Sequence, residues 1–380
     1  MKYYVIAGEA SGDLHGSNLI EALNIVDKDA FYKIWGGDLM KAAIGKKGEL
    51  QKHYKDLAFM GFLEVVQNIF TILKNIKFCK QDILDFKPDA LVLIDYPGFN
   101  LRIAKFAKKH GIKVFYYISP QLWAWKEGRI KILKNYVDEL CCVLPFEEDF
   151  YNKHNYPIHY VGHPLLDALD KFQFNPNFKE QNELPAKPIV ALLPGSRAQE
   201  VKTMLPLMVQ LSNNFPNHQF VIAGVNHLDK EFYNQNIGTS DIKIVYNQTY
   251  DLLNNSSAAV VTSGTATLET ALLNVPQLVG YKGSKISYEI GKRLVKIKYI
   301  SLVNLIADEA VIKEFIQDQY TLNNLNEELN QLLNNEKYGQ TIANAYGKIR
   351  EQLGGGGASE TTAKLLYNFA DSAKVPSVKN

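Results

Sequence analysis

The sequence predicts an α/β protein with two domains, each built on a parallel β-sheet. The length of 380 residues suits about two domains with separate cores. Short apolar runs rich in β-branched residues alternate with helical periodicity almost from the first residue, which is typical of parallel α/β proteins. The alternation stops in a polar segment and then restarts, so the two halves should share one architecture.

The first half forms the expected N-terminal domain, residues 1–170. Its expected strands are residues 2–7, 31–35, 90–94, 114–118 and 140–144, and its expected helices are residues 13–26 and 64–86. A loop at residues 8–12, with glycine at both ends, joins the first strand to the first helix.

The second half begins after a polar linker, residues 171–188, which contains Pro176, Pro185 and Pro188. The expected C-terminal domain covers residues 189–350, with strands at 189–193, 220–223, 242–245 and around Val260. Residues 351–380 contain the break Gly354–Gly357 and then a helix with Ser359 as its N-cap. We expect this helix to pack back on the N-terminal domain.

Composition excludes several classes of protein. The net charge is only +2, which gives no reason to expect nucleic acid as a partner. The three cysteines, Cys79, Cys141 and Cys142, cannot form a disulfide framework, so we expect buried thiols in a reducing cytoplasm. The N-terminal apolar run is too short for a signal peptide. No stretch of about 18 apolar residues predicts a transmembrane helix.

No metal site is expected. Asp27-Lys28-Asp29 has the spacing of an Asp-x-Asp metal motif, but it lies in a polar turn away from the carboxyl ends of strands. His159 and His163 are separated by a predicted strand end and turn rather than placed on one helix face. The chain also lacks zinc-like Cys/His spacing and the P-loop motif.

The strongest functional signal is the segment from Val260 to Glu269. An apolar strand ends at Ser263-Gly264-Thr265 and a helix begins there, so backbone N–H groups at the helix N-terminus are available to a phosphate. Glu269 lies one turn after Thr265, where its carboxylate suits the two hydroxyls of a ribose. The pattern predicts a nucleotide-diphosphate site; the alternative is an N-capped helix with a surface glutamate.

Leu193-Pro194-Gly195-Ser196-Arg197 repeats this strand–loop–helix pattern and adds a cation. Ser196 and Arg197 are candidate diphosphate contacts, because a guanidinium matches phosphate oxygens in pairs. Arg197 would also neutralise charge on a departing nucleotide. The alternative is a salt bridge between Arg197 and Glu200.

Asp95 is the candidate general base. It directly follows the apolar run Ala90–Ile94, and active sites of open α/β sheets lie at the carboxyl ends of strands. Tyr96 and Pro97 should partly desolvate its carboxylate, which raises the pKa and favours proton abstraction. The alternative is a turn or a helix cap.

The first loop supplies two further candidate substrate contacts, Ser11 and Gly12, where glycines permit close backbone approach. Its glycines do not match G-x-G-x-x-G. Asp38 could serve as the acid that follows the second strand of a dinucleotide fold, so an oxidoreductase is a further alternative.

Three regions are candidates for lipid or sugar contacts. They are the apolar stretch 57–66, the basic amphipathic stretch 282–298, and the loop that carries Trp123 and Trp125. Core packing or an ordinary solvated face would explain each equally well.

Taken in order, the motifs resemble those of the lipid-A-disaccharide synthase family. The resemblance rests on Ala7–Asp13, Ile94–Asn100, Tyr117–Trp125, Leu144–Glu147, Val161–Pro164, Leu193–Arg197, Ser263–Ala266 and Lys292–Val295. It implies the GT-B glycosyltransferase fold, in which two Rossmann-like parallel-sheet domains face a central cleft.

The resemblance also implies a reaction. The family transfers 2,3-diacylglucosamine from UDP to the 6-hydroxyl of 2,3-diacylglucosamine 1-phosphate, giving a β-1,6 disaccharide and UDP with inversion. It implies no cofactor, since the UDP-sugar is a substrate, and no obligatory metal. Asp95 matches the family's essential aspartate, Arg197 its diphosphate arginine and Asn304 a functional asparagine. Ser263, Gly264, Thr265 and Glu269 match the UDP site of the wider fold.

The chain departs from the family pattern at Tyr96-Pro97-Gly98, where Ala-Pro-Asp is common, and at Val303, where proline is common. The resemblance implies a cytoplasmic protein held peripherally on the inner face of the membrane, and a homodimer that exchanges C-terminal segments. Rival hypotheses are a UDP-N-acetylglucosamine 2-epimerase or peptidoglycan transferase of the same fold, and a non-catalytic nucleotide-sugar-binding module.

Overall fold

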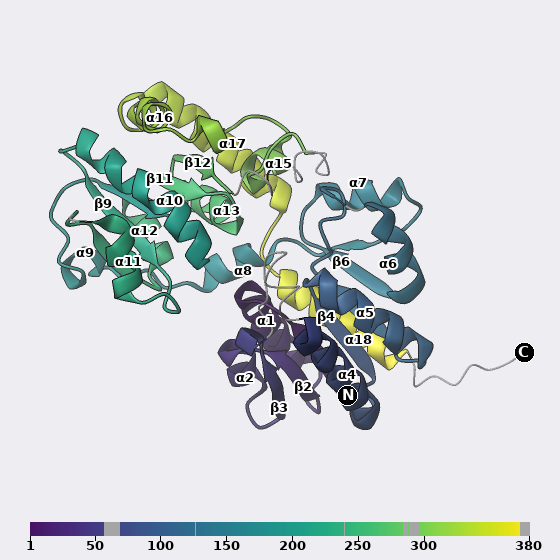
Figure 1. The fold of residues 1–380 in the computed structure, drawn as a ribbon. Helices are drawn as coiled ribbons and strands as arrows, with labels where there is room; N and C mark the ends of the chain where they lie inside the picture. The colour runs from purple at the N-terminus through teal and green to yellow at the C-terminus, as the bar shows by residue number, and fades with distance from the viewer. Residues whose placement is uncertain (57–68, 126, 239, 284–287, 289–296, 373–380) are drawn as a thin grey trace, which may run out of the picture. The chain divides into compact units, whose positions relative to one another are not determined.

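The computed structural model describes residues 1–56, 69–125, 127–238, 240–283, 288 and 297–372 (Figure 1). The chain forms two compact units: Met1–Asp170 with Gly355–Asn380, and Lys171–Gly354. The apolar stretch 57–66 and most of the basic stretch 282–298 lie outside the described residues.

The first unit contains a seven-stranded parallel sheet in the order β3-β2-β1-β4-β5-β6-β7. The strands are β1 (Lys2–Ala7), β2 (Phe31–Gly36), β3 (Gly48–His53), β4 (Ala90–Ile94), β5 (Val114–Tyr117), β6 (Glu139–Cys142) and β7 (His159–Tyr160). The helices are α1 (Ala10–Val26), α2 (Asp38–Ile44), α4 (Ile69–Phe86), α5 (Pro97–Lys109), α6 (Ile130–Tyr136), α7 (Phe146–Asn152), α8 (Pro164–Lys171) and α18 (Ala358–Asp371).

The second unit contains a six-stranded parallel sheet in the order β10-β9-β8-β11-β12-β13. The strands are β8 (Ile189–Leu193), β9 (Gln219–Gly224), β10 (Lys243–Tyr246), β11 (Ser256–Thr262), β12 (Gln277–Tyr281) and β13 (Glu314–Ile316). The helices are α9 (Phe178–Gln181), α10 (Ala198–Leu211), α11 (Lys230–Ile237), α12 (Thr249–Asn254), α13 (Thr265–Leu272), α15 (Leu302–Ala307), α16 (Leu322–Asn334) and α17 (Glu336–Leu353).

The α/β class with two parallel sheets is confirmed. β4 and β8 are buried along their whole length, so they read in the sequence as continuous apolar runs. Cys79, Cys141 and Cys142 are buried free thiols, as predicted. β3 and β7 were not predicted: they lie at the edges of their sheet, where polar residues are tolerated and no apolar run marks them.

Some predicted boundaries are wrong for local reasons. α1 begins at Ala10, three residues earlier than expected, and so absorbs part of the predicted loop. β5 ends at Tyr117 because Ile118 has a φ of +64°, which is incompatible with a strand. The strand predicted at 140–144 ends at Cys142, because the chain then turns into α7.

The strand order reverses at one point in each sheet. In the first unit β2 lies on one side of β1 and β4 on the other, with Ala7 opposite Ile94. In the second unit β9 and β11 flank β8, with Leu193 opposite Val261. Open α/β sheets bind ligands beyond the carboxyl ends of strands at such reversals. The loops that follow β1, β4, β8 and β11 are therefore the places to look for a site.

The C-terminal helix belongs to the first unit. α18 packs against α1, far away in sequence (Figure 1). The Asp167 carboxylate accepts the N–H groups of Gly357 (2.5 Å), Ala358 (3.2 Å) and Ser359 (2.9 Å). The predicted N-cap at Ser359 is therefore wrong: Ser359 lies inside the first turn, and a side chain from α8 caps the helix.

Candidate active site

Asp95 lies at the reversal point of the first sheet in an unusual backbone conformation. The φ angles of Asp95 and Tyr96 are +43° and +50°, a region that non-glycine residues rarely adopt and that is often found at functional sites. The Asp95 carbonyl accepts hydrogen bonds from the Tyr116 hydroxyl (2.6 Å) and the Asn100 amide (2.7 Å), which hold this conformation. Tyr96 rather than Asp95 is the N-cap of α5, so the Asp95 carboxylate is not used as a helix cap.

The surroundings of the Asp95 carboxyl favour its protonated, neutral form. Burial raises its pKa to about 7, and the negative charge of Glu9 acts in the same direction. A backbone hydrogen bond from Tyr96 opposes the shift. A carboxylate with a pKa near the working pH is well matched to general base catalysis.

The loop after β1 lies next to Asp95. A Cβ at Gly8 would clash with the Tyr96 ring, so glycine is needed where the two loops touch. Ser11 is exposed in the first turn of α1, where it can contact a ligand. Gly12 is buried, and a Cβ there would lie 3.1 Å from the Ala7 Cβ. This placement gives Gly12 a role in packing α1 against β1.

At the reversal point of the second sheet, the N-terminus of α13 is open. Gly264 and Thr265 are exposed. Among the residues that the structure describes, no side chain caps this helix and nothing lies within 4 Å of a Cβ built on Gly264. Ser263 is used internally: its hydroxyl donates to the Ile300 carbonyl (2.8 Å) and its N–H to the Gly280 carbonyl (3.0 Å). Two hydrogen bonds thus fix the loop at Ser263, and the next two residues are exposed to solvent. An anion site needs both a fixed loop and accessible backbone N–H groups.

Glu269 lies on the same helix, one turn after Thr265. Its Oε1 accepts the Tyr250 hydroxyl (3.0 Å), and burial raises its pKa while this hydrogen bond lowers it. The Tyr250 ring packs edge-on against Phe172, with ring centroids 5.1 Å apart. Tyr250 therefore orients Glu269 and leaves the second carboxylate oxygen for another donor, such as a sugar hydroxyl.

Arg197 makes the salt bridge that the sequence left as an alternative. Its guanidinium donates to Glu200 Oε1 (2.9 Å), and Glu200 Oε2 accepts the N–H groups of Ser196 (3.2 Å) and Arg197 (3.3 Å). The Arg197 side chain is still 54% exposed. In this state the N-terminus of α10 is occupied by its own carboxylate, while Arg197 remains accessible to an anion.

Asn304 is buried, and its side chain forms hydrogen bonds to residues in and just before β13, the edge strand of the second sheet. Its amide donates to the Ile312 carbonyl (2.8 Å) and to Glu314 Oε1 (2.9 Å), and its oxygen accepts the Ile312 N–H (3.0 Å). Glu314 also accepts the N–H of Ile300 (2.9 Å), whose carbonyl binds Ser263. Asn304 thus reaches the α13 loop through Glu314 and Ile300.

Several residues that shape these edges were not found from the sequence. They are Glu9, Asn100, Tyr116, Glu147, Tyr250 and Glu314. Among them, Glu9, Asn100 and Glu147 had a signal, since they lie in the motifs Ala7–Asp13, Ile94–Asn100 and Leu144–Glu147. Burial raises the pKa of Glu147 to about 7, although hydrogen bonds from Ser119, Leu144 and Trp123 lower it. The neighbouring Cys142, Tyr151 and the half-buried Tyr160 all have raised pKa values, and partial or full burial is the largest cause.

The Asp27–Asp29 and His159/His163 patterns, from which no metal site is expected, take part in other interactions. Asp27 accepts the N-terminal amino group (2.9 Å) and the Tyr3 hydroxyl (3.1 Å), and its other oxygen accepts the Asp29 N–H (3.2 Å), which makes a turn. His159 pairs with Glu139 (2.7 Å). The described part of the chain holds no group of three or more His, Cys, Asp or Glu side chains suited to a metal ion. None of the helices in that part is long and apolar enough to span a bilayer.

Solved structures with the same fold support the two-sheet architecture. A UDP-GlcNAc 2-epimerase from Neisseria meningitidis has a TM-score of 0.67 at 16% identity and covers 97% of this chain and 100% of its own. The glycosyltransferase of kitacinnamycin has a TM-score of 0.65 at 11% identity, with 97% and 98% coverage. At these identities the likeness shows the fold alone.

Sequence relatives are more specific. A lipid-A-disaccharide synthase from Coxiella burnetii is 40% identical over 370 residues, which cover 96% of this chain and 97% of that protein. One from Geobacter metallireducens is 36% identical over 378 residues, with 96% of each chain covered. The family model for lipid-A-disaccharide synthetase matches residues 3–369. With these motifs at the carboxyl edges of two parallel sheets, the chain belongs to the lipid-A-disaccharide synthetase family of glycosyltransferases.

Proposed function

We propose that this glycosyltransferase moves 2,3-diacylglucosamine from UDP to the 6-hydroxyl of 2,3-diacylglucosamine 1-phosphate, in one inverting displacement. The products are the β-1,6 disaccharide 1-phosphate and UDP. The observation that carries the proposal is Asp95: a carboxyl with a pKa raised to about 7, at the sheet reversal and within a motif of the family. A hydroxyl acceptor needs such a base, whereas UDP binding alone does not.

In this mechanism Asp95 acts in its deprotonated form. It accepts the proton of the acceptor hydroxyl as that oxygen attacks the anomeric carbon. The bond from the anomeric carbon to the β-phosphate oxygen breaks, and its electron pair leaves with UDP. The acid formed at Asp95 later loses its proton to solvent, which restores the base.

The donor contacts come from the second unit. The open N-terminus of α13, at Gly264 and Thr265, provides backbone donors for the diphosphate. Glu269, oriented by Tyr250, accepts the ribose hydroxyls. Arg197 exchanges its partner Glu200 for the diphosphate and stabilises the charge that develops on UDP. Asn304 acts as a positioning residue, because its amide is buried and bonded to Glu314.

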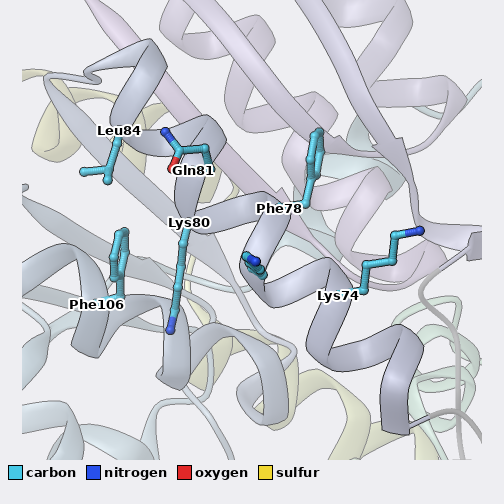
Figure 2. Close-up of a pocket in the computed structure, with 7 residues that line it drawn as sticks. Lys74, Phe78, Lys80, Gln81, Leu84 and Phe106 are labelled. Carbon is cyan, nitrogen blue, oxygen red and sulfur yellow. The ribbon is translucent and has the colours of Figure 1, made fainter.

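Membrane contact is proposed for the exposed face of α4. Phe70, Leu73 and Phe78 are 83%, 52% and 48% exposed. Figure 2 shows Phe78 and Lys74 on this helix and Lys80 beside the Phe106 ring of α5, where Lys80 Nζ lies 5.2 Å from the ring centroid. Apolar groups flanked by lysines suit an anionic bilayer surface. Co-sedimentation should be stronger with phosphatidylglycerol vesicles than with phosphatidylcholine vesicles and weaker for Phe70→Ser; equal binding to both would count against this face.

We further propose that the protein works on the inner face of the cytoplasmic membrane as a homodimer with exchanged C-terminal segments. In such a dimer Asp167 of one copy would cap α18 of the other. A monomeric mass by light scattering in detergent-free buffer would contradict the dimer.

The transfer is tested by mass spectrometry with both lipid substrates in detergent micelles, with and without EDTA. Tetraacyl disaccharide 1-phosphate and an equal amount of UDP should form, and Asp95→Ala should lose both. A parallel reaction without acceptor separates the epimerase hypothesis, because an epimerase converts its UDP-sugar alone. UDP binding without any product would favour the non-catalytic module.

A further inference from the structure

The loop Ser119–Trp125 lies at the same sheet edge as Asp95. β4 and β5 are neighbours, with Ile94 opposite Tyr117, and the Asp95 N–H donates to the Tyr117 carbonyl (3.1 Å). Because the loop begins two residues after Tyr117, its position and the position of Asp95 depend on the same strand end.

A buried carboxylate holds this loop. Glu147 Oε1 accepts the Ser119 hydroxyl (2.6 Å) and the Trp123 indole N–H (3.1 Å), and Oε2 accepts the Leu144 N–H (3.1 Å). Glu147 is 1% exposed. All three partners are donors, so they match a carboxylate and not a carboxamide, whose NH₂ would face another donor.

Two further features show that the loop is held firmly. Tyr151, one turn after Glu147 on α7, donates its hydroxyl to the Pro120 carbonyl (3.2 Å). Ile118 has a φ of +64°, which a β-branched residue keeps only where surrounding contacts enforce it. The loop ends in Trp125, which is 42% exposed and has the Arg129 guanidinium 5.9 Å from its ring centroid.

We infer that Glu147 is a positioning residue for the acceptor: its carboxylate fixes the loop Ser119–Trp125, which presents Trp125 at the Asp95 edge as a wall of the acceptor site. An exposed indole held in one place suits the apolar face of a sugar or the start of an acyl chain. The inference rests on the proposed function, since that places the acceptor at Asp95. Glu147 is too deeply buried to touch the substrate itself.

The test compares Glu147→Gln with Asp149→Asn, which removes an exposed acid from the first turn of the same helix. Glu147→Gln should raise the acceptor KM and lower kcat, each by about tenfold, and leave the donor KM within about twofold. Asp149→Asn should change none of these constants. A Glu147→Gln enzyme that melts at a lower temperature but keeps the wild-type acceptor KM would overturn the inference, because Glu147 would then be purely structural.

Tryptophan fluorescence gives a second readout that does not need activity. The chain has three tryptophans, and Trp35 is fully buried, so acrylamide quenching reports mainly Trp123 and Trp125. Quenching should increase in Glu147→Gln, and in Ser119→Ala, which removes one donor and serves if the first variant does not fold. Unchanged quenching in the folded variants would refute the loop's dependence on Glu147. A wild-type protein without transfer would instead refute the proposed function.

Discussion

The two sheets carry different chemistry at the carboxyl ends of their strands. The edge of the first unit holds two carboxyls, Asp95 and Glu147, whose pKa values burial raises to about 7. The edge of the second unit also has a carboxyl whose pKa burial raises, Glu269, but it adds groups that suit an anion: the N-terminus of α13 and the exposed Arg197. The difference indicates a division of tasks. The edge of the first unit has a buried carboxylate that can accept a proton, and the edge of the second unit offers hydrogen-bond donors to an anion.

The second unit repeats the contrast on a smaller scale. α10 and α13 begin after adjacent strands, yet α10 is capped by Glu200, whereas α13 is capped by no side chain in the described part of the chain. A carboxylate already satisfies the donors of α10, so a diphosphate should prefer α13. The same strand–loop–helix pattern therefore produces one closed and one open helix terminus.

The largest effect is expected at the first edge. Asp95→Asn keeps the size of the side chain but cannot accept the acceptor's proton, so kcat should fall by about 10²- to 10⁴-fold. The donor KM should stay unchanged, because UDP is assigned to the other edge. Asp85→Asn, an exposed acid on α4, is the matched control. An Asp95→Asn enzyme with more than about a tenth of wild-type kcat would remove Asp95 from the base role.

The pH dependence of the reaction should follow from the same group. A base works deprotonated, so kcat/KM should fall as the pH drops below about 7, by about tenfold per pH unit for each ionisation. Glu147 titrates in the same range, and Glu147→Gln allows Asp95 to be followed alone. Activity that stays constant from pH 8 down to pH 5 would contradict the raised pKa.

A smaller effect is expected at the second edge. Glu269→Gln replaces one of two acceptor oxygens, so the Kd for UDP should rise by about tenfold, measured by calorimetry. Tyr250→Phe removes only the orienting hydroxyl and should raise Kd by about two- to fivefold. Glu231→Gln, an exposed acid on α11, is the control. If it weakened UDP binding as much as Glu269→Gln, the assignment of Glu269 to the ribose would fail.

Stability should change in opposite directions at the two edges. The folded-state pKa of Asp95 is raised, so its ionised form costs stability above pH about 7, and no such cost exists below the unfolded pKa near 4. Asp95→Asn should therefore stabilise the protein at pH 8, on the order of 1 to 2 kcal/mol after allowance for partial solvent access, and not at pH 4. Glu200→Ala removes a capping box and should destabilise by about 1 kcal/mol. Thermal melts at pH 4 and pH 8 measure both changes in stability. If both variants changed the melting temperature in the same direction at pH 8, the comparison of the two edges would be contradicted.

The sequence by itself determined the architecture and the main site loops. Fully buried strands such as Ala90–Ile94 and Ile189–Leu193 are legible because both faces of a parallel strand are covered. Asp95, Ser196 and Gly264 could be placed because each lies within three residues of the end of an apolar strand, and the local pattern alone fixes that position.

Only the tertiary structure decided which partners those residues have. Glu147 and Ser119, Tyr250 and Glu269, and Asp167 and α18 are brought together across long sequence separations. It also showed that Arg197 pairs with Glu200, an option that the sequence left open. The physical reason is that periodicity and propensity act over a few residues, whereas the burial of a carboxyl and the donors around it depend on elements that meet only when the sheet forms.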